Sequence, residues 1–398
     1  MTLYEDLKWR GLIKDVTDPK IEEKLNNEKM TFYIGTDPTA DSLHLGHLSS
    51  FLISTRLAAA GHKPILLIGG ATGRIGDPRP TSEREMKTIE EVEHNIKCLT
   101  KQVKELFGFE VVNNYDWSKD INFIDFLRDY GKFFNINYML DKDIIRRRLS
   151  SGITYTEFSY MIMQALDFLH LHKEKNVSMQ VAGSDQWGNI TAGVDLIRKK
   201  TGDEVYAFTM PLVTDKNGKK FGKSEGNALW LDKTKTSPYE IYQYLLNSDD
   251  SKVIDYLKIF TFLSREEIEN IEKINNEVPE KRIAGHTLAY EVVKFLHGKE
   301  EADNVKRITE EVFKKGGIDI NMPSLDIEKK DRNIMDLLVD IELAPSKSEA
   351  RRLITQGGIS INREKVLDPN KMVDDNMIND GSIIVGKGKK VFIKINIK

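Results

Sequence analysis

The stretch TFYIGTDPTADSLHLGHL, residues 31–48, decides the fold. Its apolar beginning, residues 32–34, is typical of a buried strand, and Gly35 and a polar loop separate it from an apolar-periodic segment with His44 and His47. The pattern predicts a strand, a loop and the start of a helix, where free N–H groups and the helix dipole favour a phosphate. The two histidines share a face of that helix. A nucleotide site and two ordinary histidines at a helix start are both consistent with this spacing.

The composition indicates a globular protein of two or three domains, because 398 residues with 40% hydrophobic side chains can build substantial cores. Cys98 is the single cysteine, which excludes an internal disulfide and a cysteine-based structural zinc site and fits a reducing cytoplasm. The charged beginning lacks the apolar core of a signal peptide, and no apolar run is long enough to span a membrane. We therefore expect a cytoplasmic protein without a membrane span. The net charge of −3 argues against non-specific coating of nucleic acid, although a local basic face can still bind a particular one.

A β–α–β unit follows the opening stretch. Residues 48–60 carry an apolar face and stop at Gly61, and residues 64–68 (PILLI) are typical of a strand covered on both faces. The next residues, GGATGRIGDP, place Asp77 near the carboxyl end of that strand. Their glycines suit a turn that approaches a ligand closely, and they are also compatible with an ordinary glycine-rich loop.

Two further elements are predicted before residue 115. Ser82 and Glu85 have the spacing of a capping box that opens a long helix towards Phe107. Residues 109–112 then have the character of a strand, and the sequence NNYDW follows it.

A stripe of polar side chains runs along one side of the helix predicted over residues 156–172. Tyr160, Gln164 and Asp167 cluster opposite the apolar side of this helix. A solvent-facing stripe is one interpretation, but such faces are usually filled with Lys and Glu. The residue types favour a stripe that faces a ligand.

A second junction of strand, glycine and helix begins at residue 177. Residues 177–182 are a predicted strand, GSDQWGN leads into a helix that runs to Lys200, and residues 210–213 are a further predicted strand. The loop TDKNGKKFGKSEGN, residues 214–227, holds four lysines and almost no apolar anchor, so we expect it to be mobile. Its lysines suit closure over a polyphosphate; a solvated charged turn is the alternative.

The character of the chain changes after Ser237. Capping signals at Ser237 and Ser264 open helical periodicity that runs to about Lys315, and residues 316–332 have the composition of a linker. A short helix, a second helix capped by Ser346 and several short strands follow. Residues 345–398 carry eleven Lys or Arg against six Asp or Glu, which suits a phosphate backbone or, alternatively, a solvated basic surface.

With these motifs in order, the chain resembles the bacterial-type tyrosyl-tRNA synthetases, a family of class I aminoacyl-tRNA synthetases. His44-Leu45-Gly46-His47 resembles the first signature of the class, and Lys220-Phe221-Gly222-Lys223-Ser224 resembles the second. The segments GGATGRIGDP, TEFSYMIMQALDF and VAGSDQWGNITAG lie between them. The segment APSKSEARRLITQGGISINREKV resembles an RNA-binding domain shared with a ribosomal protein.

The resemblance implies activation of L-tyrosine by ATP to tyrosyl-adenylate, followed by transfer to the 3′-terminal adenosine of tyrosine tRNA. It implies a set of contacts to tyrosine: Tyr33 and Asp167 at the phenol, Asp77, Tyr160 and Gln164 at the ammonium group, and Gln186 at the carboxylate. It implies a set of contacts to ATP: Thr39 and His44 at the departing pyrophosphate, His47, Gly183 and Asp185 at the ribose, Gly35 and Asp37 elsewhere in the ATP site, and Lys220, Lys223 and Ser224 over the phosphates. The expected tRNA contacts are Arg84, Lys347, Arg351, Arg352 and Arg363.

The fold that the resemblance implies is α/β with several parts. We expect a Rossmann-like parallel-sheet catalytic domain over residues 1–225, a helical domain over 226–317, a linker over 318–332 and a small α/β RNA-binding domain over 333–398. A homodimer is expected from the family. Magnesium is expected to accompany ATP, held by phosphates and water rather than by a metal site of the protein.

Two alternatives differ in function. A stand-alone RNA-binding or regulatory protein would keep the fold without the chemistry, but it would be expected to lose charges from the lysine loop or the polar stripe. Activation of tryptophan is the nearer alternative. Asp167 and Tyr33 favour a phenol over an indole.

Overall fold

The computed structural model describes residues 1–79, 86–224, 227–315, 324–328, 332–341, 343–362, 364–374, 377–378, 381–388 and 391–397. These residues fall into two compact units, Met1–Lys299 and Glu300–Lys398. The finer division into catalytic domain, helical domain, linker and RNA-binding domain stays a prediction.

A six-stranded sheet forms the centre of the first unit, in the order β1-β6-β5-β2-β3-β4. Its five long strands are parallel and only the short β1 is antiparallel. The strands are β1 (Asp15–Val16), β2 (Thr31–Thr36), β3 (Lys63–Ile68), β4 (Glu110–Asn113), β5 (Val177–Gly183) and β6 (Tyr206–Met210). This is the predicted parallel α/β sheet.

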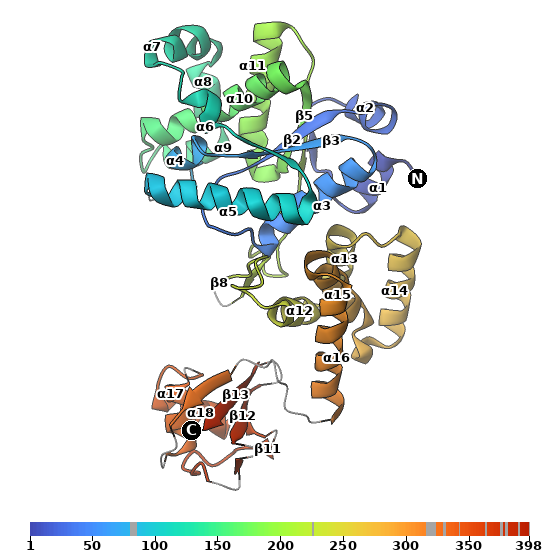
Figure 1. Ribbon diagram of the computed structural model, residues 1–398, viewed down its shortest axis with the longest axis vertical. Helices are drawn as coiled ribbons and strands as arrows, with labels where there is room; N and C mark the ends of the chain where they lie inside the picture. The colour runs from blue at the N-terminus through green and yellow to red at the C-terminus, as the bar shows by residue number, and fades with distance from the viewer. Residues whose placement is uncertain are drawn as a thin grey trace. The chain divides into compact units, whose positions relative to one another are not determined.

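Helices cover both faces of this sheet, as Figure 1 shows for α5 and α10 on opposite sides of β2 and β3. Tyr33, Ile65 and Leu67 share one buried cluster with apolar residues of α10 and α11. The helices of this part are α1 (Leu3–Trp9), α2 (Ile21–Asn27), α3 (Leu45–Ala59), α4 (Thr72–Ile75), α5 (Ile89–Phe107), α6 (Tyr115–Ser118), α7 (Phe123–Asp125), α8 (Ile136–Leu140), α9 (Asp143–Arg148), α10 (Tyr155–Lys175) and α11 (Trp187–Thr201). The strands therefore read as continuous apolar runs because both of their faces are buried.

The strand order reverses next to β2. From β2 the chain continues to β3 on one side, whereas β5 pairs with β2 on the other side. In open parallel sheets, ligands bind in the crevice outside the carboxyl ends of the strands at such a reversal. The loops after β2 and β5 are thus placed for binding.

A helical segment completes the first unit. It contains α12 (Pro238–Leu246), α13 (Val253–Phe260), α14 (Arg265–Glu277) and α15 (Ile283–His297). Two short antiparallel strands, β7 (Lys223–Ser224) and β8 (Asn227–Ala228), precede it. Ser237 and Ser264 form the capping boxes that their sequences predict.

The second unit has its own sheet and core. Its sheet has the order β11-β10-β12-β13-β9, and its buried core includes Ile334, Leu338, Ile354 and Ile383. The elements are α16 (Lys299–Lys315), β9 (Ser324–Ile327), α17 (Ile334–Asp340), α18 (Lys347–Thr355), β10 (Ile359–Ile361), β11 (Glu364–Lys365), β12 (Ser382–Lys387) and β13 (Val391–Ile397). Ser346 caps α18, as its sequence predicts.

Two predicted boundaries were wrong. The strand predicted over residues 210–213 is instead Tyr206–Met210, because Pro211 has no N–H to donate to the ladder. The long helix ends at Phe107 as predicted but begins at Ile89, where the Thr88 side chain accepts a hydrogen bond from the Glu91 N–H. The predicted capping pair of Ser82 and Glu85 lies outside the described residues.

Membrane-spanning helices were also sought. Within the part of the chain that the structure describes, no helix combines the length and the apolar character needed to cross a bilayer.

Candidate active site

The carboxyl edge of the sheet gathers the residues that the sequence singled out. Tyr33 belongs to β2, Asp37 and Thr39 follow it, Asp77 follows β3, and Asp185 follows β5. Gly35 and Gly183 are the corresponding glycines near the ends of β2 and β5. Thr39, Gly35 and Asp185 are exposed at this edge. The parallel strand order therefore brings these residues, which are far apart in sequence, to the same edge of the sheet.

Asp167 is the most deeply buried acid of this group. Its side chain is 2% exposed and accepts hydrogen bonds from Asn114 Nδ2 and Trp117 Nε1, each at 2.9 Å. Burial raises the pKa of Asp167 to about 7, although the two donated hydrogen bonds lower it and the charge of Asp37 raises it further. The carboxyl group is thus poised to gain or lose a proton near neutral pH.

Tyr33 is buried beside Asp167. It is 1% exposed, and its ring lies 5.3 Å from that of Phe168. Burial, together with the negative charge of Asp167, raises the pKa of Tyr33, so its hydroxyl stays protonated. This hydroxyl has no hydrogen-bond partner among the described residues. Buried hydroxyls are rarely left unpaired, so a polar group of a ligand is the natural partner.

A hydrogen-bond network connects Asp37 with Asp167. Tyr160 Oη donates to Asp37 Oδ2 at 3.0 Å, and Thr72 Oγ1 donates to Asp37 Oδ1 at 2.9 Å. Asn114 Nδ2 lies 3.0 Å from Thr72 Oγ1 and also donates to Asp167. The two acids are therefore connected by the side chains of Tyr160, Thr72 and Asn114, which come from three segments of the chain.

The polar stripe on α10 does not face solvent. Tyr160 is 7% exposed, Asp167 is 2% exposed, and Gln164 between them is half-buried. The solvent-facing interpretation is therefore wrong for Tyr160 and Asp167. Burial also raises the pKa of Tyr160, so its hydroxyl can act as a hydrogen-bond donor at neutral pH.

Sequence reasoning missed Asn114, Trp117 and Thr72. Asn114 and Trp117 lie in the NNYDW segment directly after β4, and Thr72 lies in the glycine-rich loop after β3. Their position at the carboxyl ends of predicted strands was the available signal. It gave no role, because the hydrogen-bond partners of these three residues that are described above lie at least 35 residues away in sequence.

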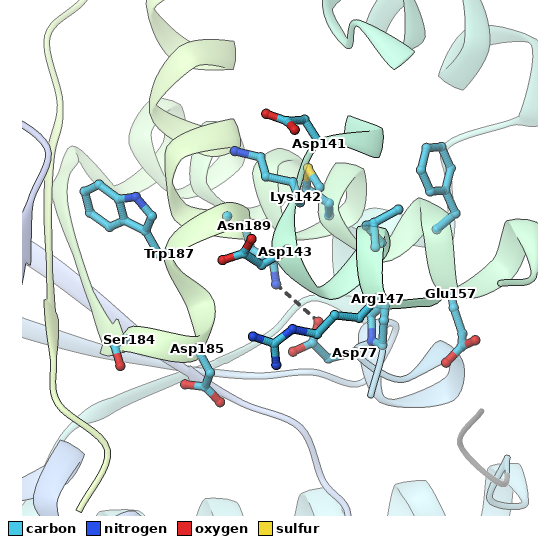
Figure 2. A pocket seen from close by; sticks show the side chains of 15 residues that line it. Asp77, Asp141, Lys142, Asp143, Arg147, Glu157, Ser184, Asp185, Trp187 and Asn189 are labelled. Atoms are coloured by element: carbon cyan, nitrogen blue, oxygen red, sulfur yellow. Dashed lines mark hydrogen bonds between the residues drawn. The ribbon is translucent and has the colours of Figure 1, made fainter. Parts of the chain in front are cut away.

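A cavity of about 480 Å³ opens beside Asp77 (Figure 2). Gln186 Nε2 donates to Asp77 Oδ2 at 2.7 Å, and Asn189 Nδ2 donates to Asp77 Oδ1 at 3.2 Å. Asp185 lines the same cavity, whereas Tyr33 and Asp167 are not among its lining residues. Asp77 and Gln186, predicted to bind opposite charges of one amino acid, are thus direct neighbours.

The two histidines form the start of α3. His44 is its N-cap: His44 Nδ1 accepts from the Gly46 N–H at 3.0 Å, and His47 Nδ1 accepts from the His44 N–H at 3.2 Å. The imidazole rings stack with centroids 3.9 Å apart. Burial lowers the pKa of His47 to about 3, with further contributions from His44 and Lys220, so His47 is neutral at physiological pH. The helix start predicted from residues 31–48 is confirmed.

The second signature lies directly against the first. A Cβ atom placed on Gly222, whose φ is +86°, would lie 2.6 Å from the Gly46 backbone nitrogen. The Leu229 N–H donates to the Gly222 carbonyl, and the Leu45 N–H donates to the Leu229 carbonyl. Only glycine permits this approach at Gly222, for reasons of both space and backbone conformation.

The lysine loop has an apolar anchor, which corrects the expectation that it has almost none. Phe221 is 4% exposed and stacks on Phe260 with ring centroids 4.8 Å apart. Lys220 is exposed beside this anchor. The side chains of Lys223 and Ser224 lie outside the described residues, although both positions belong to β7. One predicted phosphate contact is thus placed beside the histidines, and two are not described.

The predicted tRNA contacts in the second unit share one helix. Lys347, Arg351 and Arg352 belong to α18 and are exposed. Lys347 pairs with Asp336 at 2.5 Å and Arg352 with Glu349 at 2.6 Å, so neighbouring acids partly neutralise this basic face. Arg84 and Arg363 lie outside the described residues.

Comparison with known proteins finds matches along nearly the whole chain. A family model described as class I tRNA synthetases for tryptophan and tyrosine matches residues 25–314, and one for the C-terminal domain of tyrosine–tRNA ligases matches residues 317–395. A tyrosine–tRNA ligase of Limosilactobacillus reuteri is 48% identical and one of Pediococcus pentosaceus is 47% identical, each alignment covering 100% of both chains. A C-terminally truncated mitochondrial tyrosyl-tRNA synthetase of Aspergillus nidulans superposes with a TM-score of 0.70 at 34% identity, covering 78% of this chain and 94% of that one.

Proposed function

Because the chain belongs to the family of class I tRNA synthetases for tryptophan and tyrosine, we propose that it joins L-tyrosine to tyrosine tRNA. A carboxylate oxygen of tyrosine attacks the α-phosphorus of ATP, the bond to the β-phosphate oxygen breaks, and pyrophosphate leaves. A terminal hydroxyl of the tRNA then attacks the carbonyl carbon of tyrosyl-adenylate, and AMP leaves. The relatives named tyrosine–tRNA ligase, aligned over the whole chain, support this assignment.

The buried pair of Tyr33 and Asp167 is proposed to determine which amino acid is bound. The Tyr33 hydroxyl has no partner in the described part of the chain, and Asp167 accepts hydrogen bonds only from Asn114 and Trp117 among the contacts identified there. A phenol hydroxyl can donate to the Asp167 carboxylate and accept from Tyr33. Phenylalanine would leave both groups unpaired, and an unpaired buried polar group is costly. The pair therefore favours tyrosine over phenylalanine.

Asp77, Tyr160 and Gln164 are proposed to hold the ammonium group of tyrosine, and Gln186 its carboxylate. The 2.7 Å bond between Gln186 and Asp77 supports a shared subsite, because the two charged groups of an α-amino acid lie on one carbon. Of these four residues, Asp77 lines the cavity described above. Fixing both groups would orient the attacking carboxylate oxygen towards ATP.

The phosphate end lies where α3 begins. Thr39 and His44 are proposed to contact the departing pyrophosphate, His47, Gly183 and Asp185 the ribose, and Gly35 and Asp37 other parts of ATP. Lys220, Lys223 and Ser224 are proposed to stabilise negative charge as the pentacoordinate phosphorus forms. The start of α3 adds the positive end of its helix dipole. No side chain is required as a covalent nucleophile.

Magnesium is proposed to enter with ATP. No group of three His, Cys, Asp or Glu side chains that could hold a metal ion occurs within the part of the chain that the structure describes. Phosphate oxygens and water are the proposed ligands, consistent with the way Mg²⁺ keeps several waters. No step above is assigned to the metal.

The second unit is proposed to bind tRNA through Lys347, Arg351 and Arg352, with Arg84 and Arg363 as further contacts. A homodimer is also proposed, supported by exposed apolar side chains at and around α7 to α10: Phe123, Ile124, Leu127, Ile136, Tyr138, Leu149 and Tyr155. The molar mass in solution tests it. A cytoplasmic location is proposed from the single cysteine.

Amino-acid-dependent exchange of labelled pyrophosphate into ATP tests the proposed function. We expect exchange with tyrosine and none above background with phenylalanine or tryptophan. Charging of tyrosine tRNA should follow with the same preference. Absence of tyrosine-dependent exchange would contradict the proposal, and tryptophan-dependent exchange would replace it with the other specificity of the family.

A further inference from the structure

The first part of the lysine loop is a closed hairpin. Thr214 and Lys220 form an antiparallel bridge, the Phe221 N–H donates to the Val213 carbonyl at 3.0 Å, and the Asp215 N–H donates to the Lys219 carbonyl at 2.8 Å. Lys220 is therefore fixed by the backbone at the base of this hairpin. What holds the base also holds Lys220.

Two tyrosine hydroxyls from the helical segment hold the two sides of this base. Tyr256 Oη, on α13, donates to the Thr214 carbonyl at 2.9 Å. Tyr244 Oη, on α12, accepts from the Gly222 N–H at 3.0 Å. Thr214 precedes the loop lysines and Gly222 lies between Lys220 and Lys223. The hydroxyls thus bracket the part of the loop that carries Lys219 and Lys220.

The rings of the same tyrosines enclose Phe221. Its ring centroid lies 5.3 Å from that of Tyr244 and 4.7 Å from that of Tyr256, and the Phe260 ring stacks on the Phe221 ring at 4.8 Å. Phe221 lies directly between Lys220 and Gly222. Each tyrosine therefore contributes a ring to the anchor and a hydroxyl to the backbone.

Helix α13, which carries Tyr256, is held by two arginines from the beginning of the chain and from α3. Arg10 Nη1 donates to the Lys258 carbonyl at 3.0 Å and Arg10 Nη2 to the Leu263 carbonyl at 2.7 Å, while Arg56 donates to the Thr261 carbonyl. These carbonyls lie at or just beyond the end of α13. Arg56 belongs to α3, the helix that starts with the two histidines. Helix α13 and the histidines are thus linked through α3.

We propose that Tyr244 and Tyr256 are positioning residues that set the place of Lys220 relative to His44 and His47. This inference rests on the proposed function, because it assigns a consequence to the proposed role of Lys220 at the phosphates. The tyrosines touch no substrate; they act through the loop backbone. Their loss lowers the rate of adenylate formation and leaves tyrosine binding intact, because Tyr33 and Asp167 are held by other residues.

The test uses Tyr244→Phe and Tyr256→Phe in the full chain, because phenylalanine keeps the ring and removes only the hydroxyl. Tyr206→Phe is the matched control, since Tyr206 is buried like Tyr256 and its hydroxyl donates one hydrogen bond, to Glu204. We expect kcat of pyrophosphate exchange to fall about fivefold in each loop variant, the effect of losing one neutral hydrogen bond. The KM for tyrosine and the control should change less than about twofold.

A double-mutant cycle separates positioning from a general effect on stability. If the tyrosines act through Lys220, Tyr244→Phe should have no further effect on kcat in the Lys220→Ala background. An unchanged kcat in both single variants, or the same fivefold loss in the Lys220→Ala background, would overturn the inference.

Trypsin cleavage at Lys216, Lys219 and Lys220 tests the anchoring independently of activity. We expect cleavage within the loop to be about fivefold faster in Tyr244→Phe and Tyr256→Phe than in wild type and Tyr206→Phe. Equal cleavage rates would overturn the inference even in a protein without exchange activity. The wild-type exchange rate tests the proposed function separately.

Discussion

The amino-acid end and the phosphate end of the candidate site are built in different ways. At the amino-acid end, Asp167 is 2% exposed and is held by Asn114 and Trp117. At the phosphate end, Lys220 is exposed, and what is buried is its neighbour Phe221. The first end fixes the functional side chain itself, whereas the second fixes the backbone beside it.

This difference matches what each end is proposed to do. Discrimination between tyrosine and phenylalanine depends on buried polar groups that a wrong substrate leaves unpaired. Stabilisation of a short-lived phosphate charge depends on cations that reach it from solvent and are correctly placed when it forms. Changes at the amino-acid end should therefore alter which substrate reacts, and changes at the phosphate end should alter only how fast it reacts.

The largest effect is expected from Asp167→Ala. The substitution leaves the phenol of tyrosine and Trp117 without an acceptor and leaves Asn114 only Thr72 as a partner among the bonds described above, so kcat/KM for tyrosine should fall about 1,000-fold and the preference over phenylalanine should largely disappear. Exchange assays with both amino acids measure this. Unchanged kinetics with tyrosine would show that Asp167 does not contact the substrate. The proposed difference between the amino-acid end and the phosphate end would then be wrong.

A smaller effect is expected from Lys220→Ala. Loss of one cation at the developing phosphate charge should lower kcat about 100-fold, with the KM for tyrosine unchanged. The ratio of rates with tyrosine and phenylalanine should stay as in wild type. Lys216→Ala is the control, because Lys216 pairs with Asp249 at 2.6 Å and has no proposed role. A change in amino-acid preference in Lys220→Ala would contradict the proposed separation of roles.

The smallest effect is expected from Trp117→Phe, measured as a pH profile. The pKa of Asp167 is about 7, above its ordinary value, so kcat/KM should decline as pH falls through 7 and the carboxyl group becomes protonated. The Trp117 N–H donates to the carboxylate and lowers this pKa, so its removal should raise the pKa. The decline of kcat/KM should then begin at higher pH. At pH 7, kcat/KM of Trp117→Phe should be about tenfold lower than that of wild type, and this difference should shrink in alkaline solution.

Trp9→Phe serves as the control for that profile. Trp9 lies on α1, whereas the hydrogen bonds to Asp167 come from Asn114 and Trp117. Its profile should match that of wild type. An identical pH profile in Trp117→Phe and wild type would mean that Trp117 does not tune Asp167.

Much of the fold could be predicted from local patterns. Residues 31–48 predict their strand, loop and helix because buried parallel strands are continuously apolar and helices carry capping signals. The strand predicted at residues 210–213 was wrong because a single apolar run does not specify where pairing ends. Pro211 stops the ladder, and the strand consists of the residues before it.

The candidate site was predictable in part. Residue type and spacing selected Tyr160, Gln164 and Asp167, and the resemblance gave them roles that remain proposals. Asn114 and Trp117 were not selected, because neither has a local pattern that relates it to Asp167. The anchoring of Phe221 was missed for the same reason: its aromatic partners come from α12 and α13.

The sequence by itself determined most of the strands, the helix caps at Ser237, Ser264 and Ser346, and the presence of two class signatures, since these depend on side chains close together in the chain. Only the tertiary structure decided that Gly46 and Gly222 meet and that Asp37 and Asp167 share one hydrogen-bond network. Those contacts join segments far apart in sequence. Their geometry is fixed by the parallel strand order, which brings the loops after β2, β3, β4 and β5 to one edge.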